Sequence, residues 1–504
     1  MKKIIRQYSK VFILALAFGA VVSCDDYVDV NKDLDNPGVE DLTPDAMLAG
    51  AQTTTASTLN GTMNQLGNLF TTNWSGNATD FSSPFRTEFQ YDLTSTFYTG
   101  IWSNLMVRTH NFSHIEKYNG EGNWDYHKAI SKILKSFYFQ YLVDLYGDIP
   151  YSQNHDRNIL FPEYDNAKTE IYPALYDSLD EAIALIQNTD VTTVKSAASA
   201  DVILNGNMDE WVKVANTLKL RLLIRQSVIA QTDAAIQTYV NDKFTELVND
   251  GAQFVSSDVT VNPGYINSEG KQNPFYEAYG FNALGSDADS SRRLVGPSKY
   301  VSDFLRGILP NTTPDERRFR IYQPRSGTEI AGVVQGATTG RPSYLGPGII
   351  KGSDQDLYLM LSAESYFLQA EAVQRGYLPG SAQGLFNQGV EASFITLGLD
   401  GATATNYIAN SDFLDGLGWT GSTDKIQAII TQKWIALNSI NGIEGWIEYT
   451  RTGYPANIPL PTITSQTSRP VRLLYPQSEY SGNSNNVPNQ TAGDAFTSKV
   501  FWYN

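Results

Sequence analysis

Apolar residues recur at helical spacing in several long stretches of the chain, and this limits the architectures open to it. Within residues 129–145 they fall three or four positions apart, as in a helix that buries one broad face. The same spacing occurs in residues 168–186, 209–229, 356–375, 381–397 and 424–438. We expect neighbouring helices to pack antiparallel. Such helical hairpins predict a TPR-like stack, although none of them carries the TPR consensus.

Two further regions have the composition of loops. Residues 251–355 are rich in Gly, Pro, Ser and Asn and contain short β-branched runs. Because a structureless connector of this length is uncommon inside a compact domain, we expect a loop-rich insertion with a few short strands. Residues 452–504 are rich in proline and should wrap around the helical body, since apolar residues such as Leu473 and Trp502 would otherwise be exposed.

The predicted fold class is therefore mainly α, a TPR-like superhelix of helical hairpins with a loop-rich insertion. One domain should cover residues 41–504. Its helical body would comprise about residues 41–250 and 356–451, and its loop-rich regions about residues 251–355 and 452–504. Arg221 and Arg225 lie four positions apart on an apolar helix, so we expect them either to snorkel to the surface or to pair with buried acids such as Glu364 or Glu371.

The N-terminus has the layout of a secretory signal peptide. Residues 1–23 begin with basic residues and continue into an apolar run that is too short to span a membrane. The run ends in VVSC, which resembles the bacterial lipobox, and Cys24 is the single cysteine of the chain. We expect Cys24 to be the lipidated first residue of the mature protein. The alternative is a cleaved export signal with an incidental cysteine.

Residues 24–40 are acidic and rich in turn formers, as expected of a solvated tether. An EF-hand-like spacing of acidic residues lies within them. However, Leu34 occupies the position at which the sharp turn of a calcium loop requires glycine. We therefore favour a plain linker over a calcium site.

Composition argues against several classes of function. The formal charge is −16, which disfavours binding to nucleic acid, because that requires clustered Lys and Arg. Four histidines and one cysteine leave few ligands for zinc or iron, and we predict no metal and no cofactor. The chain lacks the nucleophile-elbow, zinc-protease and phosphate-loop motifs, so an enzyme is not expected.

Several local strings resemble one known family. They are LYGDIPY at 145–151, WVKVANTLKLRLLIR at 211–225, AESYFLQAEAVQRG at 363–376, QKW at 432–434, EYTRTGYP at 448–455 and RPVRLLYPQSE at 469–479. Together with the lipobox, they resemble the SusD/RagB family of outer-membrane lipoproteins, in particular its SusD-like nutrient-binding branch. The resemblance is weakest over residues 60–100 and 251–355.

The resemblance implies a TPR-containing helical fold and a lipid-anchored protein at the outer face of the outer membrane. It implies a partner, a SusC-like TonB-dependent barrel that imports the oligosaccharide captured by the lipoprotein. Some family members handle peptides instead, so a peptide ligand stays open. A surface TPR scaffold that binds only protein partners is a further alternative.

A glycan-binding protein needs aromatic platforms and polar groups on loops held by a rigid scaffold. Two segments that combine aromatic and polar residues offer candidates. These are Trp74, Phe81, Phe85 and Arg86 in the first segment and Tyr276, Tyr279, Phe281 and Arg292 in the second. An acidic ligand would require a local cationic cluster, for which the dense candidate is Arg292, Arg293, Arg317, Arg318 and Arg320.

Overall fold

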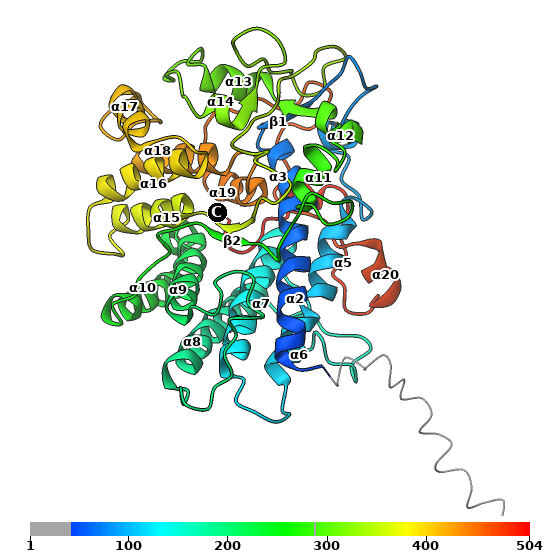
Figure 1. Cartoon of the computed structure of the whole chain (residues 1–504), viewed down its shortest axis with the longest axis vertical. Helices are drawn as coiled ribbons and strands as arrows, with labels where there is room; N and C mark the ends of the chain where they lie inside the picture. The colour runs from blue at the N-terminus through cyan, green and yellow to red at the C-terminus, as the bar shows by residue number, and fades with distance from the viewer. Residues whose placement is uncertain (1–41, 287–288, 504) are drawn as a thin grey trace, which may run out of the picture.

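A computed structural model describes residues 42–286 and 289–503 of the protein. Cys24, the tether and the EF-hand-like spacing lie outside the described residues. The predicted mainly-α fold is confirmed, since helices dominate the described chain and its strands form three short two-stranded sheets (Figure 1). No helix within the described residues is long and apolar enough to cross a membrane.

The described chain consists of long and short helices with short strands between some of them. The first half has α2 (Pro44–Thr58), the π-helix Leu59–Met63, α3 (Asn64–Phe70), β1 (Trp74–Gly76), α4 (Arg86–Gln90), α5 (Thr99–Arg108), α6 (His110–Lys117), α7 (Asp125–Tyr146), the π-helix Ala167–Ile171, α8 (Tyr172–Asn188), α9 (Met208–Arg225), the 3₁₀-helix Ile229–Gln231 and α10 (Ala234–Asn249). The second half has β2 (Val259–Val261), α11 (Pro274–Tyr279), α12 (Asp289–Leu294), β3 (Val295–Pro297), α13 (Lys299–Leu305), α14 (Arg318–Ile321), β4 (Tyr322–Gln323), β5 (Tyr344–Leu345), β6 (Leu357–Met360), α15 (Ser362–Gln374), α16 (Ala382–Thr396), α17 (Gly401–Ser411), α18 (Lys425–Leu437), α19 (Gly442–Thr452), α20 (Gln477–Gly482) and α21 (Asp494–Thr497).

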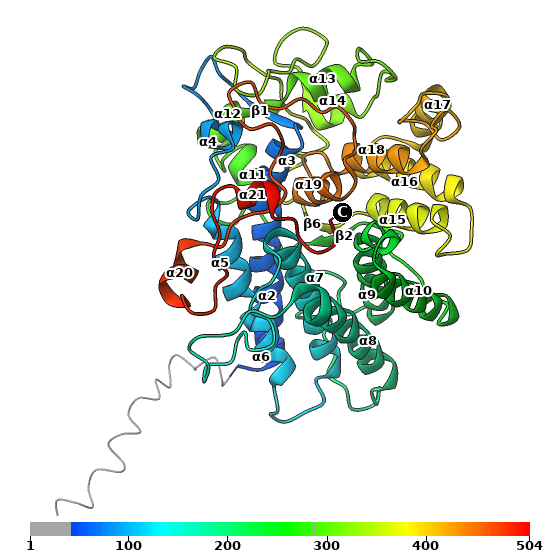
Figure 2. The same ribbon diagram turned by 180° about the vertical axis from the view of Figure 1, so that it is seen from behind.

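Most of the long helices pack against the helix that precedes or follows them in the chain. α7 packs against α6 and α8, α8 against α9, and α15 against both α16 and α18. Figure 1 shows these helices forming the lower and left parts of the molecule, whereas α13 and α14 with their loops lie at the top and α11 and α12 lie below them on the right. The turned view in Figure 2 shows the same separation. The loop-rich part is therefore carried on one end of a helical scaffold.

Two predicted helices differ from the observed ones. The helix predicted for residues 356–375 begins only at Ser362, because Leu357–Met360 forms β6, which pairs antiparallel with β2. The helix predicted to reach Ile229 ends at Arg225 and is followed by a short 3₁₀ turn. In both cases apolar residues continue the helical spacing beyond the helix itself.

The C-terminal region wraps around the helical body, as predicted. The backbone N–H of Leu473 donates to the carbonyl of Leu145 over 2.8 Å, and Leu473 is buried. The indole Nε1 of Trp502 donates to Asp144 over 2.8 Å, and Trp502 is fully buried. These contacts tie the end of the chain to α7.

A network of buried charges joins α7, α9, α15, α18 and α19. Arg221 pairs with Glu364 at 2.7 Å, which confirms one predicted pairing. Arg225 instead contacts the other carboxylates, Asp144, Glu444 and Glu448. We call the full set the buried ionic network: Asp144, Arg221, Arg225, Glu364, Glu371, Lys433, Glu444, Glu448 and Arg451.

A partly buried histidine in the loop after α7 should make the stability of the protein depend on pH. His155 lies here against α5 and α6; its Nδ1 contacts the Ser113 hydroxyl and its Nε2 the Met106 carbonyl, each at 2.8 Å. Burial lowers the pKa of His155 to about 4. Protonation therefore favours the unfolded chain, so this residue costs stability as the pH falls from about 6.5 to 4, by about 3 kcal/mol.

His155→Asn is the matched variant, because His155 has a φ of +65° and asparagine tolerates this left-handed conformation. Urea denaturation at pH 7 and pH 4.5 should show a smaller loss of stability for the variant than for the wild type. An identical loss in both proteins would mean that His155 does not titrate as its burial implies.

Candidate functional site

The two segments predicted from sequence to bind ligand are brought together by one strand pair. β1 pairs antiparallel with β3, with Trp74 opposite Pro297 and Gly76 opposite Val295. Asn77, directly after β1, is buried; its backbone N–H donates to the Leu294 carbonyl over 2.8 Å. The loop after β1 therefore lies beside α12, which precedes β3.

Aromatic rings and guanidinium groups alternate at this junction. The guanidinium of Arg292 lies 4.3 Å from the ring centre of Phe281 and 4.4 Å from that of Tyr344. The guanidinium of Arg325 also lies 4.0 Å from the ring centre of Tyr344, and its Nη1 donates to the Tyr344 hydroxyl over 2.9 Å. These are distances at which cations attract aromatic faces.

Phe81, from the loop after β1, completes this arrangement. Its ring lies 6.0 Å from the guanidinium of Arg293. Phe81, Phe281 and Tyr344 are each only half-buried, so part of every ring stays at the surface. We call the set the aromatic–arginine face: Phe81, Phe281, Arg292, Arg293, Arg325 and Tyr344.

An ion pair holds the loop after β1 in place at the edge of this face. Arg341 contacts Asp80 at 2.7 Å, and the side-chain amide of Asn77 donates to the same carboxylate over 2.8 Å. The hydrogen bond from Asn77, followed by that from Arg341, lowers the pKa of Asp80. The loop is thus fixed by contacts of Asn77 and Asp80, just before Phe81.

Two predicted platforms are not available to a ligand. The indole of Trp74 is fully buried, and its Nε1 donates to the Ser439 hydroxyl over 2.8 Å. Tyr279 is buried against Trp74, with ring centres 5.4 Å apart, and its hydroxyl donates to Gln65 over 2.7 Å. The prediction that these two rings lie on the ligand-facing surface is therefore wrong, because both anchor the loops to the core.

The other predicted residues lie around the aromatic–arginine face. Tyr276 is half-buried, with its ring centre 6.4 Å from that of Phe281. Phe85 is half-buried and packs on Phe89 at 5.9 Å. Arg86 is exposed, and its Nε donates to Gln90 over 3.3 Å. Tyr276 extends the face, whereas Arg86 begins the short helix α4 and Phe85 directly precedes it.

The predicted cluster of five arginines does not form. Arg317 is fully buried, where it pairs with Asp315 at 2.7 Å. Arg318 pairs with Glu316 and Glu329, and the Nε of Arg320 donates to a backbone carbonyl. Arg292 and Arg293 are instead joined by Arg325 and Arg341, which sequence reasoning missed together with Tyr344. No local motif marked these three residues, because contacts with Arg293, Asp80 and Arg292 in the tertiary structure place them here.

The site has the chemistry of a binding surface. Ring faces suit the apolar faces of a ligand, and guanidinium groups supply hydrogen-bond donors for its oxygens. Among the described residues, no group of three or more His, Cys, Asp or Glu is placed to hold a metal ion.

Comparison with known proteins agrees with this fold. The family model described as "Starch-binding associating with outer membrane" matches residues 37–476. No curated protein matches the sequence. A chitin-binding SusD homolog from Flavobacterium johnsoniae is similar in structure, with a TM-score of 0.69 and 25% identity, covering 90% of this chain and 97% of that one.

Further solved structures share the fold at lower identity. A protein named as chitin-binding has a TM-score of 0.69 and 23% identity, covering 91% of this chain and 99% of its own. A SusD homolog from Bacteroides thetaiotaomicron has a TM-score of 0.70 and 18% identity, covering 92% and 99%. Because the family model spans most of the sequence, the chain belongs to the SusD-like family.

Proposed function

We infer that the protein is a surface lipoprotein that captures oligosaccharides on the aromatic–arginine face and passes them to a SusC-like TonB-dependent transporter. Cys24 would carry the lipid anchor in the outer membrane. The observation that carries this proposal is the pairing of β1 with β3, which gathers partly exposed rings and guanidinium groups on one face of a SusD-like fold. The family description and the chitin-binding relatives support a glycan as the ligand.

The face is suited to a sugar chain because its donors are held in place before binding. Arg292 is held between two rings and Arg325 is bonded to Tyr344, so little side-chain freedom remains to be lost on binding. The face also carries several cations, which would allow negatively charged sugars despite the acidic overall charge.

We expect Phe281→Ala and Phe81→Ala each to weaken oligosaccharide binding about tenfold, because each removes a large ring contact. Isothermal titration with chito- and malto-oligosaccharides, uronic-acid oligosaccharides and short peptides would measure the loss. Phe161→Ala is the control, since Phe161 is 53% exposed in a different loop. Unchanged affinity in both test variants, or binding of peptides alone, would contradict the proposal.

Transfer to a transporter has its own expected result. A tagged copy extracted gently from outer membranes should bring down a TonB-dependent barrel in stoichiometric amount, identified by mass spectrometry. An untagged strain is the control. Recovery of the lipidated protein by itself would contradict the transfer step while leaving glycan binding in place.

A further inference from the structure

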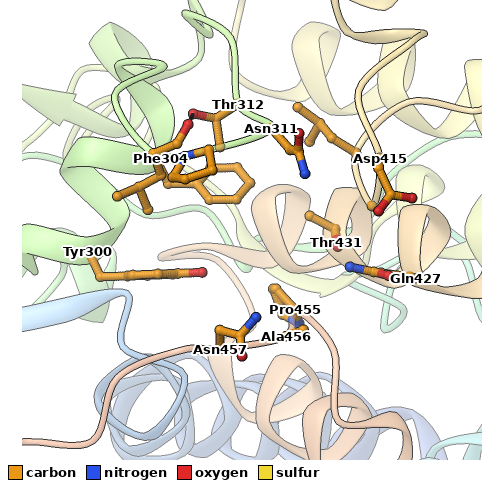
Figure 3. Close-up of a pocket in the computed structure, with 14 residues that line it drawn as sticks. Tyr300, Phe304, Asn311, Thr312, Asp415, Gln427, Thr431, Pro455, Ala456 and Asn457 are labelled. Atoms are coloured by element: carbon orange, nitrogen blue, oxygen red, sulfur yellow. Dashed lines mark hydrogen bonds between the residues drawn. The ribbon is translucent and has the colours of Figure 1, made fainter. Parts of the chain in front are cut away.

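A second cavity lies away from the aromatic–arginine face. It has a volume of about 360 Å³ and lies between α13 and its following loop, the loop before α18, α18 itself and the loop after α19 (Figure 3). In Figure 1, α17 and α18 lie to the left of α13, whereas α12, with the aromatic–arginine face, lies to its right. The two places are therefore separate.

One wall of this cavity is aromatic and firmly supported. Tyr300 and Phe304 come from the same side of α13, with ring centres 6.3 Å apart. Both pack against the buried indole of Trp434, at 6.2 Å and 5.2 Å between ring centres. Figure 3 shows the Tyr300 hydroxyl pointing into the cavity. The wall is thus a rigid apolar surface with a polar end.

The sides of the cavity opposite the aromatic wall carry polar side chains that make no hydrogen bond with other described residues. They include the side-chain amides of Asn311, Gln427 and Asn457, none of which makes a hydrogen bond with another described residue. Thr431 is only 3% exposed, yet its hydroxyl also makes no hydrogen bond within the described chain. Because the Thr431 hydroxyl is not among the fully buried polar atoms of the described chain that lack a partner, water or a ligand in the cavity can reach it.

Charge and size narrow the class of ligand. Neither lysine nor arginine is among the described residues that line the cavity, and Asp415 supplies its one charged side chain. An anionic ligand would therefore meet a carboxylate without a compensating cation. The volume lies at the lower end of the range for small-molecule sites, which suits one or two sugar rings better than a long chain.

We propose that this cavity is a second saccharide site, which binds a neutral monosaccharide or disaccharide unit. The sugar's apolar face would lie on Tyr300 and Phe304. Its hydroxyls would exchange hydrogen bonds with the amides of Gln427, Asn311 and Asn457 and with the hydroxyl of Thr431. This site stands on its own lining and does not depend on ligand binding at the aromatic–arginine face.

The test uses Gln427→Met combined with Thr431→Val, which removes two polar groups and nearly preserves volume. Saturation-transfer NMR and calorimetry on the purified full chain would use glucose, N-acetylglucosamine, maltose and chitobiose, with glucuronic acid as the acidic probe. We expect wild type to bind at least one neutral sugar and the double variant to bind it at least tenfold more weakly. Phe161→Ala, which removes a 53% exposed ring that belongs to neither site, should leave this binding unchanged.

Circular dichroism and thermal melting would show that each variant is folded, and Tyr300→Phe, which removes only a hydroxyl, provides an independent milder loss. Unchanged binding of the neutral sugar by both cavity variants would overturn the proposal, as would a preference for glucuronic acid. Loss of the same binding in Phe281→Ala alone would also overturn it, because the sugar would then occupy the aromatic–arginine face. Failure of oligosaccharide binding at that face, with sugar binding in the cavity intact, would refute only the proposed function.

Discussion

Arg225→Ala should destabilise the protein by about 3–5 kcal/mol, because it leaves buried carboxylates without their cation. Arg225 is 1% exposed and contacts Asp144 at 3.1 Å, Glu444 at 2.9 Å and also Glu448. Burial by itself would raise the pKa of Glu444, but Arg225 and then Lys433 outweigh burial and lower it to about 2. Without Arg225, this attraction is much reduced while the cost of burial remains.

Urea denaturation at pH 7 would measure the loss. Lys132→Ala is the matched control: Lys132 also pairs with an acid, Glu181, at 2.7 Å, but Glu181 is 64% exposed. A pair at the surface contributes at most about 1 kcal/mol. Equal losses in the two variants would show that the buried ionic network contributes no more than a surface pair.

The network also shows how far sequence reasoning reaches. Two arginines on an apolar helix predicted buried ion pairs, and Arg221 does pair with Glu364. The partners of Arg225 could not be chosen from the sequence, because Asp144 and Glu444 lie 81 and 219 positions away. Pairing between distant helices depends on how those helices pack, and local spacing carries no information about that.

The helical body was predictable for the same reason that β6 was not. Helical spacing is a local signal, so α7, α8, α16 and α18 could be located within a few residues. Residues 357–360 fit the same spacing, yet they form a strand because β2, about one hundred positions earlier, pairs with them. A short apolar run cannot be assigned to helix or strand without knowing its partner.

The sequence predicted which segments form the candidate site, but it did not predict which of their rings are exposed. The aromatic and polar residues of two segments predicted ligand binding on both sides of the β1–β3 junction. However, sequence could not separate Trp74, which is fully buried, from Phe81, which is half-buried. A ring that anchors a loop and a ring that faces solvent come from the same residue types, and only the tertiary packing of β1 and of the loop after it decides which ring is buried.

Gly67→Ala should lower the free energy of unfolding by about 3 kcal/mol, because the backbones of α3 and α19 are in direct contact at this point. A methyl group on Gly67 would lie 2.0 Å from the carbonyl carbon of Gly442, so the helices would have to separate. Asn64 holds the same crossing, since its Oδ1 accepts from the Gly442 N–H over 2.8 Å.

The effect of Gly67→Ala should reach the candidate site, because α3 leads directly into β1, and Trp74 on β1 donates to Ser439, just before α19. Separating α3 from α19 would shift β1 and with it the loop that carries Phe81. Urea denaturation should therefore show a loss of stability, and oligosaccharide titration should show a loss of affinity.

Gly50→Ala is the matched control. Nothing lies within 4 Å of a methyl group at this exposed position in α2, so replacing this helical glycine should stabilise the protein by about 0.5–1 kcal/mol. Similar changes in both variants would mean that the close crossing of α3 and α19 does not limit stability.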